Sequence, residues 1–456
     1  MKTKLFYLLL LAFVWQSNAQ QSYGKVIVSN NMTHGVYGLL EKDLDNDGDF
    51  DLMSASEEDN SLAYYINEGA GIFTPFIIST NFDGAAFIDA ADFDNDGDMD
   101  FVACGTSDLS WFENDNGNFI EHNIASGLNE PMQVRAYDIG TVTDPATPDG
   151  DIDIGLLISG ENYVTIFMND GNNTFSRLNL ISINSPKYLN GGDFDGNNVD
   201  DFLISSYNNG EIKWYKLGSW GLELGGLVTD NFDGAFGVEG GDIDLDGDDD
   251  VIATAFLGNE VAWFENDGNA NFTKHSIDNN LPGASYLRWN DIDNDGDKDI
   301  IVMAYGNLSG SSTTGHQVVI YYNDGNQNFT KYVVDDVEQG PANFCLQDFD
   351  GDNIMDIAFA AHVSNRVVLL SSAGYFTAIH EEIPNDVKIY PNPASSVIYI
   401  KSGMNIEIID IYDITGIKIY STTEKTIHIN KFNRGYYLLQ LHTDKGKIYT
   451  QKILLK

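Results

Sequence analysis

A short acidic phrase occurs seven times in this chain. Carboxylate oxygens recur in it at positions 1, 3, 5 and 9 around a turn at position 6, and calcium prefers such flexible cages of oxygen ligands. The first copy reads Asp43-Leu-Asp45-Asn-Asp47-Gly48-Asp-Phe-Asp51, and close copies begin at Asp92, Asp138, Asp193, Asp242, Asp291 and Asp348. The sequence therefore predicts a series of calcium-binding loops.

The seven loops keep the expected ligands to different degrees. Four are complete and have glycine at position 6, where a positive φ lets the backbone wrap around an ion. The seventh has Asn353 at that turn, and asparagine tolerates left-handed geometry better than most residues. The fourth has Asn197 in place of an aspartate, so weaker binding is expected. In the third, seven extra residues separate Asp138 from Asp149, which leaves its occupancy open.

We expect about five to seven calcium sites in total, built from side-chain oxygens. The predicted ligands are Asp43, Asp45, Asp47 and Asp51; Asp92, Asp94, Asp96 and Asp100; Asp138, Asp149 and Asp153; Asp193, Asp195, Asn197 and Asp201; Asp242, Asp244, Asp246 and Asp250; Asp291, Asp293, Asp295 and Asp299; and Asp348, Asp350, Asp352 and Asp356.

Two other interpretations of the loops are less consistent with the residues. Solvated Asp-Asn-Gly turns would leave four crowded carboxylates repelling one another by roughly 3 kcal/mol per pair at about 5 Å with an effective dielectric near 20. An EF-hand loop needs a glutamate at position 12, between helices. Position 12 here is Ser54, Ala103, Ala253, Val302 or Phe359, and the flanking segments are rich in β-forming residues. Loops between β-strands are therefore expected.

The spacing of the loops predicts the architecture. Successive copies begin 49, 46, 55, 49, 49 and 57 residues apart, a period typical of one four-stranded propeller blade. An apolar strand precedes each loop (87–91, for example) and a β-rich run follows it (299–303). A third strand carries Trp111, Trp214 or Trp263, and a fourth begins at a phenylalanine. The fold class predicted is all-β, a seven-bladed β-propeller followed by a small C-terminal β-sandwich.

Two details of the propeller stay open in the sequence. Residues 24–29 resemble a fourth strand without the rest of its blade and would close the ring, but residues 375–380 compete for that place. Cys104 and Cys345 lie in different repeats with another repeat between them, so we expect two buried free thiols rather than a disulfide.

Charge and hydropathy divide the chain into three parts. Lys2 and Lys4 followed by an apolar run predict a signal peptide over residues 1–19. Residues 20–383 form the predicted propeller, and by count residues 21–383 carry 12 basic and 63 acidic side chains. Residues 384–456 carry 10 basic and 6 acidic side chains and show a small β-sandwich pattern. So acidic a body is a poor partner for nucleic acid or an anionic membrane, and we expect no transmembrane segment in the mature protein.

The repeats resemble the FG-GAP or VCBS family, whose propeller blades carry such aspartate loops as in integrin α-subunits. Phe82-Asp-Gly-Ala-Ala-Phe87 and Phe232-Asp-Gly-Ala-Phe-Gly237 are similar to the motif that names the family. The resemblance implies a calcium-stiffened platform for binding or adhesion, with no shared activity.

The C-terminal part resembles the type A C-terminal sorting domain of the type IX secretion system of Bacteroidota. The similarity lies in Tyr390-Pro-Asn-Pro393, Asp410-Ile-Tyr-Asp-Ile-Thr-Gly416, Arg434-Gly-Tyr-Tyr-Leu438 and the basic stretch at 452–456. It implies recognition by that machinery and a secreted or outer-membrane surface-attached, extracellular protein. An ordinary adhesive β-sandwich is the alternative.

No catalytic motif is evident, so binding is favoured over catalysis. His122 and His275 share one repeat position at the outer blade edge, and His316 and His362 lie in no motif. The repeating tryptophans are expected to pack between blades. We expect the ligand surface where the repeat fails, at Trp220 and at residues 141–148 and 306–315. The predicted function is a calcium-binding module for a glycan or protein, and the alternative is a secreted polysaccharide lyase or hydrolase.

Overall fold

The computed structural model describes residues 23–455 apart from 30–32, 46, 70, 116, 139–148, 198, 200, 219–220, 307–313, 372–386, 392–393, 395, 404–405, 413–417, 430, 433–434 and 444–447.

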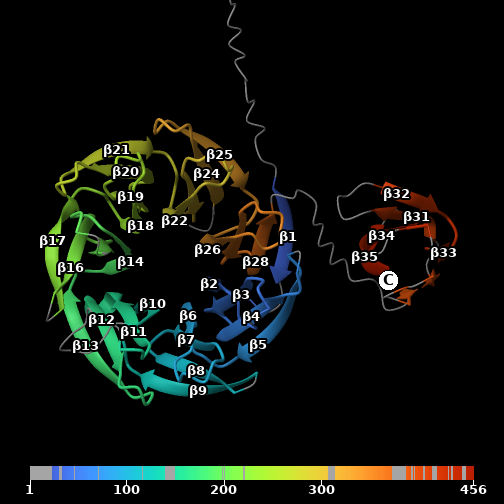
Figure 1. The fold of residues 1–456 in the computed structure, drawn as a ribbon, viewed down its shortest axis with the longest axis horizontal. Helices are drawn as coiled ribbons and strands as arrows, with labels where there is room; N and C mark the ends of the chain where they lie inside the picture. Colours follow the sequence, from blue (N-terminus) through green and yellow to red (C-terminus); the bar gives the residue numbers. More distant parts are fainter. Residues whose placement is uncertain are drawn as a thin grey trace, which may run out of the picture.

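Seven four-stranded antiparallel sheets form the blades of a ring (Figure 1). Their strands are β2 (Val36–Lys42), β3 (Asp51–Ser56), β4 (Ser61–Asn67) and β5 (Phe73–Ser79) in blade 1; β6 (Phe87–Ala91), β7 (Asp100–Cys104), β8 (Leu109–Asp115) and β9 (Asn118–Ala125) in blade 2; β10 (Pro131–Tyr137), β11 (Asp153–Ile158), β12 (Tyr163–Asn169) and β13 (Phe175–Ser182) in blade 3; β14 (Pro186–Gly192), β15 (Asp201–Ser206), β16 (Glu211–Gly218) and β17 (Gly221–Thr229) in blade 4; β18 (Ala235–Gly241), β19 (Asp250–Ala255), β20 (Glu260–Asn266) and β21 (Phe272–Asp278) in blade 5; β22 (Ala284–Asn290), β23 (Asp299–Ala304), β24 (Gln317–Asn323) and β25 (Phe329–Asp335) in blade 6; and β26 (Pro341–Gln347), β27 (Asp356–Ala361), β28 (Arg366–Ser371) and β1 (Gly24–Ser29) in blade 7.

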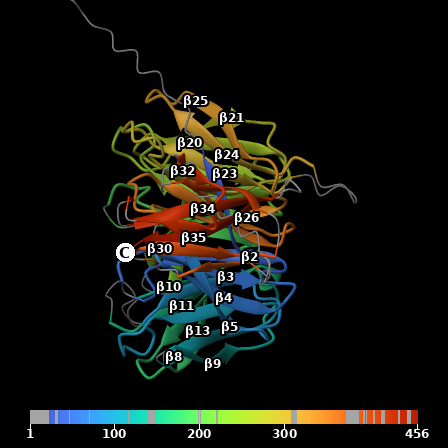
Figure 2. The same cartoon turned by 90° about the vertical axis from the view of Figure 1, so that its right-hand side faces the viewer.

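The burial of each strand follows its place in the blade. Strands β3, β11, β19, β23 and β27 are buried along their whole length. Both faces of these second strands are covered, which is why they read as apolar runs without alternation. The fourth strands, such as β9 and β21, mix exposed and half-buried residues because they form the outer edge. Figure 2 shows the blades from the side. The seven-bladed propeller predicted from the loop spacing is confirmed.

The N-terminal strand closes the ring. Strand β1 pairs antiparallel with β28, with Gly24 opposite Ser371, and completes the sheet β1-β28-β27-β26. Val26 on this strand is buried in the core of the propeller. The structure thus decides for residues 24–29, while the competing segment 375–380 lies outside the described residues.

Two sequence predictions about side chains in the core are confirmed. Trp111, Trp214 and Trp263 are all buried, and Trp263 belongs to a core cluster that also contains Leu287 and Ile300 of blade 6, as expected for a residue packed between blades. Cys104 and Cys345 are both buried free thiols.

The C-terminal part is built from two small sheets around a core of its own. One has the order β29-β30-β33 and the other β32-β31-β34-β35. Ile398, Ile409 and Leu439 are among its fully buried residues. The two sheets agree with the predicted small β-sandwich. Their strands are β29 (Lys388–Tyr390), β30 (Val397–Lys401), β31 (Ile406–Tyr412), β32 (Lys418–Thr422), β33 (Thr426–His428), β34 (Gly435–Thr443) and β35 (Ile448–Leu455).

Some predicted features lie outside the described residues. These are the signal peptide 1–19, the insertion 141–148, Trp220 and most of the insertion 306–315. A single short 3₁₀ helix, η1 (Ser159–Glu161), is present in the described part of the chain. No helix there has the length and apolar character needed to span a bilayer.

Candidate metal centres

The aspartate at position 1 organises the backbone of each complete loop. In loop 1, Asp43 accepts hydrogen bonds from the backbone N–H groups of Asp47 and Gly48, both at 3.2 Å. The loops that begin at Asp92, Asp242 and Asp291 make the same pair of bonds. Gly48 has φ of 99° and open space where a Cβ would lie, so glycine is required there for its φ. The loop therefore winds tightly around its carboxylates.

The aspartate at position 9 is buried and fixes the loop to the blade. In loop 6, the two carboxylate oxygens of Asp299 accept the backbone N–H groups of Ile292 at 3.0 Å and Asn323 at 2.9 Å. Burial of the carboxylate is the largest cause that raises the pKa of Asp299 and of Asp250 to about 7, and the pKa of Asp51 to about 6. A cation beside these groups would favour their ionised form.

In two of the loops the aspartate at position 3 has an oxygen atom without a hydrogen-bond partner among the described residues. One carboxylate oxygen of Asp293 is buried without a hydrogen bond among the described residues. One oxygen of Asp195 is too, but the other oxygen of Asp195 makes an ion pair with the Lys216 ammonium. Burial first, and the neighbouring carboxylates second, raise the pKa of Asp293 and of Asp244. In at least five loops, which begin at Asp43, Asp92, Asp193, Asp242 and Asp291, the oxygens of three aspartates lie within 4.8 Å of one another. Crowded, partly unpaired oxygens of this kind fit a hard divalent cation such as calcium.

In loops 2, 4 and 7 a phenylalanine at position 2 connects the loop to the next blade. Phe349 in loop 7 packs against Phe73 of blade 1, with ring centroids 5.8 Å apart, and its carbonyl accepts a hydrogen bond from the Asn67 side chain at 2.9 Å. The same aromatic contact recurs between Phe93 and Phe175 and between Phe194 and Phe272. The conformation of the loop therefore determines where this interface residue lies between the two blades.

The irregular loops keep much of this geometry. In loop 3 the N–H groups of Asp149 and Gly150 donate to Asp138 at 3.0 and 3.3 Å, although residues 139–148 between them lie outside the described part. In loop 7 Asn353 has φ of 66°, which confirms the left-handed turn predicted there. Calcium at loop 3 stays a prediction.

Family comparison agrees with this geometry. Residues 43–103 and 242–302 match the family described as FG-GAP-like repeat, and these two stretches contain the four complete loops. Residues 388–456 match the secretion system C-terminal sorting domain. The chain carries FG-GAP-like repeats and a type IX secretion sorting domain. No match is found among curated proteins.

A solved structure supports the fold of this chain. The chain is similar to one in the crystal structure of BBS1N in complex with ARL6DN, soaked with lead, with a TM-score of 0.50 and 12% sequence identity. The similarity covers 78% of this chain and 99% of that chain. At this identity the likeness concerns the fold alone.

The face of the propeller opposite the metal loops carries aromatic side chains, most of them half-buried. The metal loops join first and second strands, so the segments after the second strands lie at the other face. In blades 4 to 7 the first residue of these segments is aromatic or histidine. We define the aromatic face as these four residues and two side chains beside them, namely Tyr207, Phe256, Tyr305, His362, Tyr37 and Phe236.

Ring contacts join the aromatic face across several blades. Phe256 stacks on Phe236 at 5.8 Å, and Tyr37 lies edge-on to His362 at 5.7 Å. Buried Tyr286 connects the two halves, 5.2 Å from Phe236 and 6.1 Å from Tyr37. The Lys187 ammonium lies 5.3 Å from the ring centroid of Phe236. The rings therefore form one connected cluster, in which the half-buried rings at the face are joined through buried Tyr286 and Phe236.

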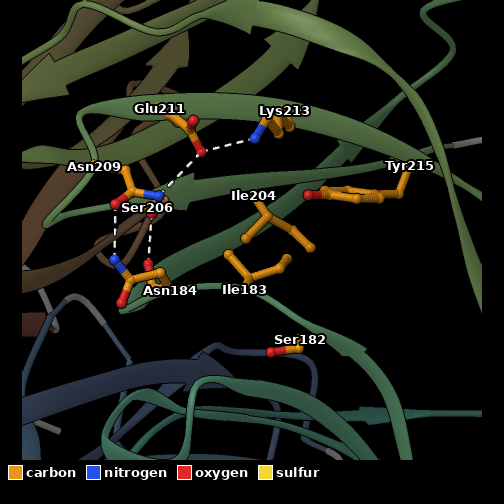
Figure 3. A pocket seen from close by; sticks show the side chains of 9 residues that line it. All are labelled: Ser182, Ile183, Asn184, Ile204, Ser206, Asn209, Glu211, Lys213 and Tyr215. Atoms are coloured by element: carbon orange, nitrogen blue, oxygen red, sulfur yellow. Dashed lines mark hydrogen bonds and ion pairs between the residues drawn. The ribbon is translucent and has the colours of Figure 1, made fainter.

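A small polar cavity lies between blades 3 and 4 at the same face (Figure 3). It has a volume of about 170 Å³. Glu211 accepts hydrogen bonds from Lys213 at 2.7 Å and Asn209 at 3.3 Å, and Asn184 donates to Asn209 at 2.7 Å. The cavity is lined by Ser182, Ile183, Asn184, Ile204, Ser206, Asn209, Glu211, Lys213 and Tyr215.

His122 and His275 differ from His362 in their surroundings. His122 stacks on Trp111 at 4.5 Å and bonds to Glu113 at 2.7 Å, and His275 repeats this arrangement, so both belong to the outer blade edge as predicted. His362 instead bonds through Nδ1 to the Tyr305 hydroxyl at 2.9 Å, and its Nε2 lies 3.7 Å from Glu57. The interaction with His362 lowers the pKa of Glu57.

Sequence reasoning missed the His362 group because its members come from blades 6, 7 and 1. A signal was nevertheless present: Glu57, Tyr305 and His362 each directly follow the second strand of their own repeat. The surfaces that were predicted instead, around Trp220 and the two insertions, lie mostly outside the described residues.

Proposed function

We propose that this protein is a secreted or surface-displayed binding module whose calcium-stiffened propeller recognises a glycan through the aromatic face. The sorting domain supports export by the type IX machinery, with residues 1–19 as the proposed signal peptide. The calcium sites proposed are the four complete loops and loop 7, in which position-1 aspartates hold the same backbone turn. The metal stiffens the ring and takes no part in ligand contact.

The observation that carries the glycan assignment is the aromatic face together with the polar cavity beside it. Half-buried rings offer flat apolar surfaces to the C–H faces of a sugar, and aromatic side chains bury large area at low cost in rotamer entropy. The cavity supplies amide, hydroxyl, carboxylate and ammonium groups for sugar hydroxyls. The alternative is a protein ligand, and a screen against both glycan and protein arrays distinguishes the two.

Substitution of aromatic-face residues is expected to weaken binding. Screening the calcium-loaded protein against glycan and protein arrays identifies a ligand, and titration then measures its Kd. Tyr207→Ala and Phe256→Ala should each weaken binding roughly 10- to 30-fold, because losing an aromatic anchor costs about 2 kcal/mol. Phe76→Ala is the matched control, since Phe76 is 42% exposed on outer strand β5. Unchanged affinity in both face variants, at wild-type melting temperature, would place the ligand elsewhere.

The Tyr305–His362–Glu57 group favours one second candidate, a carbohydrate-active enzyme. A tyrosine hydroxyl bonded to an imidazole that faces a carboxylate has the parts of a proton-transfer relay. If the purified protein cleaves a polysaccharide, Tyr305→Phe should reduce turnover by about 10²-fold or more, because it removes only the hydroxyl. Assays of released reducing ends or unsaturated products test this candidate. Turnover that survives in Tyr305→Phe and His362→Ala would exclude this group as the catalyst.

A further inference from the structure

One position of the third strand recurs at the same register in every blade, close to where the second strand leaves the metal loop. Strand register identifies it: Tyr65, Phe112, Phe167, Tyr215, Phe264, Tyr321 and Leu370 all pair with the second residue of the second strand. The residue that follows each of them is, in blades 1 to 7, Ile66, Glu113, Met168, Lys216, Glu265, Tyr322 and Ser371. The seven blades therefore place different residues at one equivalent position near the loop, and they can be compared as natural variants of that position.

Contacts show that this position acts on the aspartate at loop position 3. The Ser371 hydroxyl donates to Asp350 at 2.5 Å in blade 7. In blade 4 the Lys216 ammonium makes an ion pair with Oδ2 of Asp195. In blades 2 and 5 the same place holds a glutamate, Glu113 or Glu265, each bonded to a histidine.

Among the differences between blade 4 and the complete loops, two lower the negative charge around the aspartate at position 3. Asn197 replaces an aspartate at position 5, and Lys216 adds a positive charge at the position where blades 2 and 5 add a negative one. Lys216 is held there from other sides as well, since its ammonium lies 5.3 Å from the ring centroid of Trp214 and it pairs in register with Glu223 on β17. An ammonium already neutralises the carboxylate that a calcium ion would need.

We propose that Lys216 is a built-in counter-ion that replaces calcium in loop 4, so that this loop keeps its shape without metal. The inference rests on the proposed calcium binding of the complete loops. Loop 4 retains its turn, with the Asn197 N–H donating to Asp193 at 3.0 Å. If loop 4 binds no calcium, at most six loops of the ring can hold an ion.

Counting bound calcium tests the proposal on the whole exported chain. Equilibrium dialysis with metal analysis, together with calorimetric titration, should give one more calcium per chain for Lys216→Met and for Lys216→Glu, which restores the residue of blades 2 and 5. Lys213→Met is the control, because Lys213 pairs with Glu211 on the same strand away from the loop. Its calcium count should equal that of the wild type.

A second substitution identifies the loop that gains the ion. Asp195→Asn should leave the wild-type calcium count unchanged and should abolish the gain in the Lys216→Met background. A wild-type count that falls by one with Asp195→Asn would overturn the proposal, as would an unchanged count in both folded Lys216 variants. Absence of calcium from every variant would instead contradict the proposed function.

Discussion

Removal of calcium is expected to lower the thermal unfolding midpoint of the propeller by more than about 10 °C. A ligand present at 100 times its Kd stabilises the native state by about 2.7 kcal/mol per independent site, and the chain has four complete loops. Even if the contributions are only partly additive, the total is large against the marginal stability of folded domains.

The structure gives a reason why this loss should spread beyond the loops. Loops 2, 4 and 7 each carry a phenylalanine at position 2 that packs against the next blade, as Phe349 does against Phe73 and Phe194 against Phe272. Without the cation, the crowded carboxylates repel one another and the backbone wound around them loosens. The blade interfaces then lose the residues that the loops position.

Differential scanning calorimetry with excess chelator, followed by added calcium, measures this effect. Calcium should restore the midpoint, and magnesium should restore less of it, because magnesium demands a near-ideal octahedral site. The unfolding of the C-terminal sheets serves as an internal reference, since no aspartate loop of this kind occurs in residues 388–456. An unchanged midpoint after complete removal of metal would contradict a structural role for calcium.

Much of this architecture could be predicted because the residues that define each loop and its flanking strands lie close together in the sequence. The aspartates at positions 1 and 9 lie within nine residues of each other, so the loop and its flanking strands are visible in one stretch of sequence. Lys216 was visible in the same way: Trp111-x-Glu113 and Trp263-x-Glu265 align with Trp214-x-Lys216. Comparing repeats at this position would have identified the exception without a structure.

Contacts that depend on ring closure could not be predicted. Glu57 and His362 are far apart in the sequence and meet because blade 1 adjoins blade 7. The choice between residues 24–29 and 375–380 as the last strand has the same origin, since both have the composition of an outer strand. The local sequence pattern predicts that blade 7 needs a fourth strand. Which segment supplies that strand depends on the three-dimensional closure of the ring.

Loss of strand β1 should be the most damaging single change to the propeller. Deleting residues 24–29 exposes the edge of β28, removes buried Val26 and takes away the pairing of Gly24 with Ser371. An unpaired strand edge next to a buried core is a template for aggregation. We expect the deleted chain to be largely insoluble or oligomeric by size-exclusion chromatography.

Lys25 offers a graded version of the same experiment. Its ammonium contacts Asp335 at the end of blade 6 and lies 3.4 Å from Glu338, and both acids are at least nine-tenths buried. Lys25→Met keeps β1 but leaves Asp335 without this ion pair and Glu338 with Arg366 as its remaining cation. The free energy of unfolding in guanidinium should fall by about 2 kcal/mol, between the values for exposed and buried pairs.

Comparison with an exposed pair separates closure of the ring from general charge effects. Lys274→Met removes an ion pair with Glu260 within blade 5 and should cost less than about 1 kcal/mol. If the two lysine variants lose equal stability, the Lys25 cluster adds nothing to closure. If the deleted chain is also a soluble monomer with the wild-type midpoint, β1 does not lock the ring. Among the described elements, only β1 pairs with β28 on that side. We therefore expect the loss of β1 to disrupt blade 7 and, with it, the contact between loop 7 and blade 1.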